Sequence, residues 1–469
     1  MTKDVAMPNH TGHRRVLPTE PIESLEAYLM IGGGRALDAV ARQSPEDVIA
    51  QLRAAGLRGR GGAGFPTATK WQSILRGGGR HHYVVCNAAE GEPGTFKDRA
   101  IIRANPYQVI EGLVAAAWAV GAIEAFVVIK ASFIAEGERL ERAIGECTEA
   151  GWFTDLPITL VEGPEEYLLG EEKALLEVIE GNDPLPRWLP PYLHGLYATA
   201  PQLGWQGHDP ETGHSGEHMA NPTLVNNAET LAQAAWILAH DADTFRSVGT
   251  ASSPGTLLVT VVGDVAAPAV IEVPMGTTIR QAIDACGGAL SGRTIKAVIP
   301  GVANGVLPAA ALDTPLTYED MAAAGSGLGA GGIICYDDTA CMVEVAATLS
   351  RFLYVESCGQ CLPCKLGTGH ITEALDHIRD GHGTEHDIET IGERLHIVDD
   401  GNRCYLPTQE KQLISSMLAV FPDDFALHLE GGCAAPGRPI PTPKLTDLTD
   451  GVATYDARQD RKQPDWSYT

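Results

Sequence analysis

Short apolar segments alternate with helical segments over residues 83–181, and this alternation constrains the fold of the 469-residue chain more than any other feature. The predicted strands cover 83–87, 125–130 and 157–161, and the predicted helices cover 106–120, 133–149 and 171–180. Strands that alternate with helices of this length form a mostly parallel sheet with helices on its faces. The sequence therefore predicts an α/β domain, which a helix at 229–240 completes.

The chain changes character after this domain. Two strands rich in β-branched residues and a short helix ending at paired glycines predict a small β-grasp unit like ubiquitin, and a helical pattern follows it. We predict a flexible tail at 1–22, the α/β domain at 23–250 with an insertion at about 193–220, a β-grasp domain at 254–335, a helical domain at 338–432 and a tail at 433–469. The insertion region holds four histidines whose spacing fits no helix face, so we predict solvated side chains rather than a metal site. They are His194, His208, His214 and His218.

The charge balance excludes some classes of partner. Acidic residues number 60 and basic residues 34, which gives a formal net charge of −26. Binding to nucleic acid or anionic lipid needs a basic surface, so we predict neither. The most hydrophobic stretch, 112–129, is interrupted by Glu124, and its uncharged part, 112–123, is shorter than the ~20 residues that span a bilayer. With no apolar run of signal-peptide length at the N-terminus, we predict a cytoplasmic protein with reduced thiols and no direct membrane insertion.

Three of the ten cysteines fall close together, in a C-x2-C-x2-C run at Cys358, Cys361 and Cys364. Cys404 follows at a distance, as the fourth ligand of an iron–sulfur cluster often does, so the set predicts a [4Fe–4S] cluster. Zinc is the alternative, although four-cysteine zinc sites more often use two C-x2-C pairs. The other six cysteines lie mostly in apolar surroundings and are predicted to be small core residues. They are Cys86, Cys147, Cys286, Cys335, Cys341 and Cys433.

A glycine-rich loop at 59–64 precedes the first predicted strand. Glycines let backbone amides approach a phosphate, and Arg60 and Lys70 add positive charge. The loop lacks the G-x-G-x-x-G pattern after a strand, so a plain loop is the alternative. Residues 87–94 and 170–172 follow predicted strands, where open α/β sheets bind ligands. Carboxylates there would accept hydrogen bonds from ribose or ring N–H groups, or would simply favour a helix N-terminus.

Four segments together resemble a known family. They are Leu57-Arg-Gly-Arg-Gly-Gly-Ala-Gly-Phe-Pro-Thr67 with Lys70-Trp71, then Cys86-Asn-Ala-Ala-Glu-Gly-Glu-Pro-Gly-Thr-Phe-Lys-Asp-Arg99, Asn226-Asn-Ala-Glu-Thr-Leu231 and Glu356-Ser-Cys-Gly-Gln-Cys-Leu-Pro-Cys364. In this order they resemble the NADH-binding flavin and iron–sulfur subunit of respiratory complex I. The diaphorase subunits of NAD-linked hydrogenases and formate dehydrogenases share these segments, and the similarity covers roughly residues 35–430.

The resemblance implies a Rossmann-like flavin domain, a soluble-ligand-binding β-grasp (SLBB) domain and a C-terminal helical bundle that carries a [4Fe–4S] cluster. It implies an FMN site formed by Gly59, Arg60, Gly61, Gly62, Lys70, Asn87, Glu90, Gly170, Glu171, Glu172, Asn226 and Asn227. It places Phe65, Glu92 and Tyr192 against NADH. Cys358, Cys361, Cys364 and Cys404 would bind the cluster.

The activity implied by the resemblance is NADH oxidation through FMN, followed by transfer of single electrons to the cluster, with no catalytic side chain because the flavin carries the hydride chemistry. The implied partners are a small [2Fe–2S] subunit and larger iron–sulfur subunits. The implied location is cytoplasmic, with peripheral attachment to the cytoplasmic side of a membrane as part of a complex. The resemblance leaves open whether that complex is a respiratory complex I, a hydrogenase or a formate dehydrogenase.

The sequence departs from the family on the nucleotide side. Ala89 replaces the usual Asp, Ser73 replaces an aromatic residue, and Leu189 replaces the lysine of a Lys-Pro-Pro-Phe stretch. These changes keep a second hypothesis open, an electron-relay or scaffold subunit with altered or lost NADH binding. A zinc-bearing β-grasp binding protein is a third.

Overall fold

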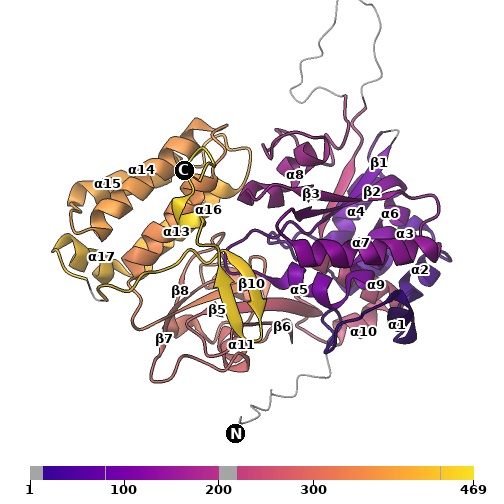
Figure 1. The fold of residues 1–469 in the computed structure, drawn as a ribbon, viewed down its shortest axis with the longest axis horizontal. Helices are drawn as coiled ribbons and strands as arrows, with labels where there is room; N and C mark the ends of the chain where they lie inside the picture. Colours follow the sequence, from indigo (N-terminus) through magenta and orange to yellow (C-terminus); the bar gives the residue numbers. More distant parts are fainter. Residues whose placement is uncertain (1–13, 80, 200–218, 434, 469) are drawn as a thin grey trace, which may run out of the picture. The chain divides into compact units, whose positions relative to one another are not determined.

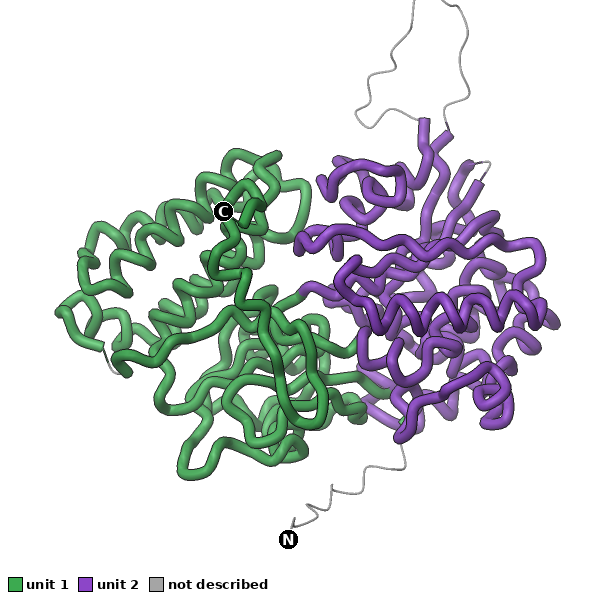
Figure 2. The backbone as a smooth tube through the Cα atoms, viewed as in Figure 1, with its two compact units in different colours: residues 1–14, 92–97, 256–469 green, residues 15–91, 98–255 purple. Residues whose placement is uncertain are grey.

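The computed structural model describes residues 14–79, 81–199, 219–433 and 435–468 (Figure 1). They form two compact units, coloured separately in Figure 2. The sheet unit comprises 15–91 and 98–255, and the bundle unit comprises 92–97 and the chain from 256 onward, with residue 14. Within the described residues, no helix is both long enough and apolar enough to cross a bilayer.

The sheet unit is built on four parallel strands in the order β3-β2-β1-β4. These are β1 (His82–Asn87), β2 (Ala122–Lys130), β3 (Ile158–Gly163) and β4 (Thr223–Asn227). The first three confirm the predicted parallel α/β sheet. β4 was not predicted, because Leu224 and Val225 are the only apolar residues between Pro222 and Asn226. Since all four strands run the same way, their carboxyl ends meet at one edge of the sheet.

Two helices form the centre of the sheet unit. They are α6 (Pro106–Val120) and α9 (Ala228–Ala239), and almost every residue of both is buried. A Cβ atom on Gly112 would lie 2.1 Å from the carbonyl oxygen of Leu231, so the two helices touch backbone to backbone at this glycine. The burial of α6 explains why the hydrophobic stretch that begins at residue 112 belongs to a core and not to a membrane span.

The sheet unit has further helices, several of which contact α6 or α9. They are α1 (Leu25–Met30), α2 (Arg35–Val40), α3 (Pro45–Ala55), α4 (Thr67–Leu75), α7 (Ile134–Glu149), η1 (Tyr167–Gly170), α8 (Glu172–Ile179) and α10 (Ala242–Arg246), while α5 (Lys97–Ala104) begins where the chain re-enters the unit. Ser44 caps α3 by accepting a hydrogen bond from the backbone N–H of Asp47.

The structure corrects two predictions about irregular segments of the sheet unit. Within the predicted tail 1–22, residues 1–13 lie outside the described residues, but Arg15 is buried and its guanidinium lies 4.3 Å above the ring of Trp236. Its Nη1 donates to the carbonyl of Phe245 at 2.9 Å. In the insertion, 200–218 lies outside the described residues, and so do His208, His214 and His218. His194 is buried, and burial and then the charge of Arg187 lower its pKa, so it is not the solvated side chain predicted.

The bundle unit begins with a five-stranded mixed sheet in the order β6-β5-β9-β7-β8. The strands are β5 (Thr256–Gly263), β6 (Ala269–Pro274), β7 (Ile295–Ile299), β8 (Leu307–Pro308) and β9 (Gly332–Asp337), with α11 (Ile279–Ala285), η2 (Ala309–Ala311) and α12 (Tyr318–Ala323) between them. An antiparallel hairpin of β5 and β6 precedes α11, and β9 returns parallel to β5. This confirms the predicted β-grasp arrangement. Thr278 and Gln281 form a capping box that fixes the start of α11.

Helices follow the β-grasp sheet, as predicted. They are α13 (Met342–Glu356), α14 (Leu362–Arg379), α15 (Glu385–Ile397), α16 (Leu406–Val420) and α17 (Pro422–Leu429). Contacts between α13, α14 and α16 place the buried faces of these helices together. Their connections carry the clustered cysteines.

The chain beyond residue 433 is not the polar tail predicted. It forms an antiparallel hairpin of β10 (Leu445–Thr449) and β11 (Val452–Tyr455), followed by a 3-10 turn, η3 (Gln459–Arg461). Charged side chains, which carry no hydrophobic period, hold it: Arg438 donates to Asp264 and Asp337, and Lys462 is fully buried. Hydrophobic patterning therefore could not reveal this segment.

Candidate functional site

Three asparagines mark the carboxyl edge of the parallel sheet. The register pairs Cys86 with Asn226 and Asn87 with Asn227, so the ends of β1 and β4 lie side by side. The Asn87 side-chain amide donates to the carbonyl oxygen of Gly170 at 2.7 Å, which fixes the connection after β3 at the same edge. The structure thus brings together residues that the sequence placed in three separate motifs.

Each of these asparagines is held by neighbours. Asn227 caps α9 by accepting from the N–H of Glu229 at 3.1 Å, and its amide donates to Asp98 at 2.6 Å. The indole N–H of Trp71 donates to the Asn226 side chain at 2.7 Å. Trp71 and Asp98 stand within the quoted motifs but were not predicted as site residues, because only the fold shows which side chains they orient.

The glycine-rich loop is closed on itself and lies against this edge. The N–H of Gly59 donates to the Phe65 carbonyl at 2.9 Å, and the N–H of Thr67 donates to the Leu57 carbonyl at 3.0 Å. A Cβ atom on Gly61 would lie 3.2 Å from the Cβ of Asn227. Gly62 has a φ of 129°, and a Cβ there would meet open space. The loop therefore presents bare backbone beside the asparagines.

Arg60 lies in the loop but points inward. Its N–H donates to the Thr230 hydroxyl at 2.8 Å, and its guanidinium Nε lies 3.9 Å from a carboxylate oxygen of Glu229. Both charged side chains are buried. In the structure Arg60 holds the loop against α9.

The remaining charged residues of the predicted FMN site also have defined partners. Lys70 donates to Glu172 at 2.6 Å. Glu171 caps α8 by accepting from the N–H groups of Lys173 and Ala174, which is the helix-terminus role that the sequence left open. Burial raises the pKa of Glu171 to about 7. Glu90 accepts from the backbone N–H of Arg99 at 3.3 Å.

These residues fit an FMN cofactor. The Thr67 hydroxyl is buried beside the loop and has no hydrogen-bond partner among the described residues, so it is able to serve a bound group. Neutral amides at the strand ends suit the polar edge of a flavin ring, and bare loop backbone suits a phosphate. The sheet edge therefore offers both kinds of contact that the cofactor needs.

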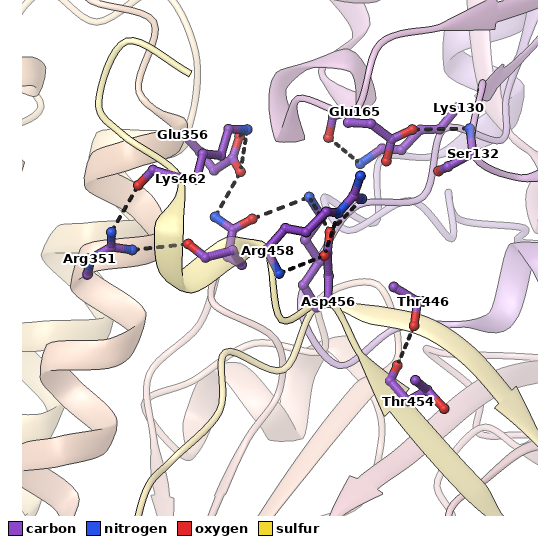
Figure 3. Close-up of polar contacts among 12 residues, drawn as sticks. Lys130, Ser132, Glu165, Arg351, Glu356, Thr446, Thr454, Asp456, Arg458 and Lys462 are labelled. Atoms are coloured by element: carbon purple, nitrogen blue, oxygen red, sulfur yellow. Dashed lines mark hydrogen bonds and ion pairs between the residues drawn. The ribbon is translucent and has the colours of Figure 1, made fainter. Parts of the chain in front are cut away.

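A buried cation at the same edge was missed. Lys130 ends β2, and its Nζ donates to the carbonyl of Glu165 at 3.1 Å (Figure 3). A Cβ on Gly91 would lie 2.7 Å from this Nζ, so the amine reaches the segment that carries the predicted flavin contacts. The sequence did offer a signal for Lys130. A lysine stands at the end of an apolar strand, where buried residues are usually apolar.

The residues predicted against NADH fall in both units. Phe65 and Tyr192 belong to the sheet unit and are 54% and 47% exposed. Glu92 belongs to the bundle unit, where its carboxylate accepts from the N–H of Ala303 at 3.1 Å. Of the positions that depart from the family, Ala89 is buried and Ser73 donates to the carbonyl of Lys70.

The four predicted cluster cysteines lie on two connections of the bundle. Cys358 and Cys361 follow α13, Cys364 stands in the first turn of α14, and Cys404 shortly precedes α16. Gln360 links the two connections, because its side chain accepts from Arg403 at 2.7 Å and contacts Cys358 at 3.7 Å. Burial raises the pKa of Cys364, and the charges of Cys404, Cys358 and Cys361 raise it further. Four neighbouring thiols on short connections suit a [4Fe–4S] cluster.

Family models match most of the chain. The Nuo51 FMN-binding domain matches residues 52–236, the SLBB domain matches 258–298, and the iron–sulfur binding region of NADH-ubiquinone oxidoreductase F matches 344–428. The first match covers the sheet edge and the glycine-rich loop. The last covers Cys358, Cys361, Cys364 and Cys404, whereas the chain from 429 onward lies beyond it.

Similar proteins of known class cover nearly the whole chain. The F 2 subunit of NADH-quinone oxidoreductase in Rhizobium meliloti is 36% identical over 87% of this chain and 94% of that protein. The HndC subunit of the NADP-reducing hydrogenase of Solidesulfovibrio fructosivorans is 34% identical over 88% of this chain and 81% of its own length. A crystal structure of an NAD+-reducing [NiFe]-hydrogenase in the H2-reduced state matches with a TM-score of 0.74 and 31% identity. That match covers 86% of this chain and 66% of the hydrogenase chain.

FMN binding and [4Fe–4S] binding in one chain define a class of electron-transfer enzyme, the flavin- and iron–sulfur-dependent NADH oxidoreductases. Within that class, the chain belongs to the family of NADH-quinone oxidoreductase F subunits and their hydrogenase counterparts. It is a subunit of a multi-subunit NADH-quinone oxidoreductase or hydrogenase complex.

Proposed function

We propose that this chain receives electrons from NADH at the carboxyl edge of the parallel sheet and releases them singly through four cysteines of the helical bundle. The observation that carries the proposal is the meeting of Asn87, Asn227 and the glycine-rich loop at one sheet edge. Bound FMN would accept a hydride and return electrons one at a time. The chain itself binds and orients the cofactor and its nucleotide partner.

The assignments follow the chemistry of each group. The side chains of Asn87, Asn226 and Asn227, with Glu90, Gly170, Glu171 and Glu172, line the flavin ring and ribityl chain. The backbone of Gly59, Gly61 and Gly62 approaches the phosphate, Arg60 holds that loop in place, and Lys70 supplies the nearby positive charge. Phe65 and Tyr192 are exposed aromatic side chains that suit stacking against a nicotinamide nucleotide, and Glu92 suits hydrogen bonding to it.

The four cysteines hold the cluster, and the next acceptors are other subunits. We propose a small [2Fe–2S] subunit and larger iron–sulfur subunits as the partners, in a complex on the cytoplasmic side of a membrane. The family similarity supports this assembly. The exposed side chains of Leu362 and Leu366 flank Cys364 on α14 and offer apolar surface near the cluster connection.

The second hypothesis, a relay subunit with altered or lost NADH binding, differs in one measurable property. Anaerobically purified complex should show flavin absorption and a brown iron–sulfur colour, and NADH should bleach the flavin. Retained flavin absorption after NADH addition would favour the relay subunit. Purified protein without flavin would contradict both hypotheses, and zinc with no brown colour would favour a β-grasp zinc protein.

A pair of cysteine variants tests the cluster assignment. Cys404→Ser should lose most of the iron of this subunit and leave its flavin content unchanged, because the two groups bind to different units. Cys147→Ala, which changes a buried thiol in the sheet unit, should retain the iron. Equal iron content in the two variants would contradict the assignment of Cys404.

A further inference from the structure

Three residues outside the predicted cluster bring potential metal-binding atoms together. Cys341, His428 and Cys433 place two thiol sulfurs and an imidazole nitrogen within 4.8 Å of one another. The Cys341 sulfur lies 3.2 Å from Nε2 of His428. Cys341 and His428 are buried, and Cys433 is half-buried. Both cysteines were predicted to be small core residues, and neither the role of His428 nor this juxtaposition was predicted.

The imidazole is oriented for metal binding. Nδ1 of His428 lies 3.2 Å from the carbonyl oxygen of Ile378, and a carbonyl only accepts hydrogen bonds. The proton of the neutral ring therefore sits on Nδ1, and Nε2 directs its lone pair toward the Cys341 sulfur. Metal-binding histidines commonly donate their second nitrogen to a carbonyl in this way.

Cys341 also stands at the N-terminus of a helix. Cys341 is the N-cap of α13, a helix of 15 residues, and its sulfur accepts from the N–H of Glu344 at 3.5 Å. Helix N-termini stabilise thiolates. Asp424 of α17 accepts from the N–H of Met342 at 3.2 Å, so α17, which carries His428, is anchored at the start of α13 before any ion binds.

We propose that Cys341, His428 and Cys433 bind one Zn²⁺ ion. Two thiolates and one imidazole are ligands that zinc prefers, and a water molecule at the half-exposed side of Cys433 completes a tetrahedron. Binding releases the two thiol protons and changes no oxidation state. Two thiolates neutralise the divalent charge, so the buried site carries no net charge. The ion would fasten the chain after α17 to the start of α13.

This site is separate from the iron–sulfur cluster. Cys341 precedes α13 and Cys358 follows it, and the 15 residues of the helix span about 22 Å at 1.5 Å per residue. One metal centre cannot use both groups of cysteines. The zinc content and the iron content therefore depend on different residues, and both can be measured in the same sample.

The test is the metal content of the intact complex, purified anaerobically and then incubated with Zn²⁺ and desalted. We expect one zinc per copy of this chain, and X-ray absorption at the zinc edge should show sulfur at about 2.3 Å and nitrogen at about 2.0 Å. Cys433→Ser, a half-buried and conservative change, should lose the zinc and keep the iron. Cys358→Ser should lose iron and keep the zinc.

Several outcomes would overturn the site. Zinc that stays in both Cys433→Ser and His428→Gln binds elsewhere. Zinc that disappears in Cys358→Ser belongs to the cluster cysteines. Wild-type complex that takes up no zinc would contradict the site. A Cys341–Cys433 disulfide, detected by mass spectrometry of the anaerobic sample, would show that the two thiols have another role. Circular dichroism of Cys433→Ser separates loss of the ion from loss of the fold.

Discussion

Lys462 donates hydrogen bonds to both carboxylate oxygens of Glu356, at 2.9 and 2.8 Å, and both side chains are fully buried (Figure 3). Glu356 is the last residue of α13 and stands two positions before Cys358. The amide of Gln459 donates to the same carboxylate at 3.1 Å. The C-terminal segment is thus bonded directly to the connection that carries the cluster cysteines.

Further contacts reinforce this connection. Arg351 on α13 donates to the carbonyls of Gln459 and Lys462. Lys365, next to Cys364, donates to the carbonyls of Ser357 at 2.8 Å and Pro464 at 2.6 Å. Two lysines and an arginine therefore tie the last residues of the chain to both ends of the first cysteine-bearing connection.

Removal of Lys462 should destabilise the bundle unit. Lys462→Met leaves the Glu356 carboxylate buried without its cation, a change that costs roughly 3–5 kcal/mol for buried ion pairs. We expect a lower thermal midpoint and faster loss of iron during storage. The double variant Lys462→Met with Glu356→Gln should recover part of the stability, since it buries no uncompensated charge.

An exposed ion pair provides the control for this prediction. Arg280 and Asp313 form a pair at 2.7 Å in which both side chains are largely in solvent. Exposed pairs are screened by water and contribute little to stability, so Arg280→Ala should change the thermal midpoint little. Equal shifts for the Arg280 and Lys462 variants would contradict the role given to Lys462.

Glu410 should make stability depend on pH. Burial in α16 raises its pKa to about 8, against the opposing effect of a 2.6 Å hydrogen bond from the Ser350 hydroxyl. In the unfolded chain the carboxyl ionises near its ordinary value of about 4.3, so the folded state binds the proton more tightly. The contribution of Glu410 to the free energy of unfolding is therefore complete below the unfolded value and is lost as the pH rises through about 8.

The neutral variant Glu410→Gln isolates this effect. Between pH 5 and 8 the wild-type stability should fall on the order of a few kcal/mol more than that of Glu410→Gln. Denaturant unfolding followed by circular dichroism at several pH values measures the difference. Parallel pH profiles for the two proteins would show that Glu410 is ionised at neutral pH in the folded state.

The sequence predicted those parts of the fold that rest on local periodicity. The strands β1, β2 and β3 and the helix α6 follow from apolar runs of the right length, and the place of Asn87 at the end of β1 follows from the same pattern. The β-grasp hairpin was accessible for the same reason. The fold class and both cofactors, FMN and the [4Fe–4S] cluster, agree with the family matches.

Features that depend on contacts between distant charged groups were not accessible. The chain beyond residue 433 is held by ion pairs such as that of Arg438 with Asp337, and ion pairs leave no periodic pattern. Lys130 and Asp98 acquire their roles only when the strand ends meet. His428 joins Cys341 only through the packing of α17 against α13. Sequence separation hides all of these relationships.

Lys70 should contribute to FMN retention. If its amine moves from Glu172 to the cofactor phosphate, Lys70→Ala removes a charged hydrogen bond to FMN. Such a bond contributes about 1.5–3 kcal/mol to binding, so we expect at least a tenfold loss of FMN affinity. Arg142→Ala is the control, because Arg142 is an exposed cation on α7 that lies 3.8 Å from Glu23, and neither residue belongs to the predicted FMN site. Flavin release measured by fluorescence should distinguish the two, and equal release would remove Lys70 from the site.

Two glycines in helices should respond to alanine in opposite directions. Gly112→Ala places a Cβ 2.1 Å from the Leu231 carbonyl, so α6 and α9 must separate and the sheet unit should lose at least ~2 kcal/mol of stability. Gly145 stands exposed in α7, and a Cβ atom there would meet no other atom within 4 Å, so Gly145→Ala should stabilise the helix by about 0.5–1 kcal/mol. Thermal unfolding of the two variants tests the packing directly. A Gly112→Ala protein as stable as Gly145→Ala would show that the two helices are farther apart than the backbone contact requires.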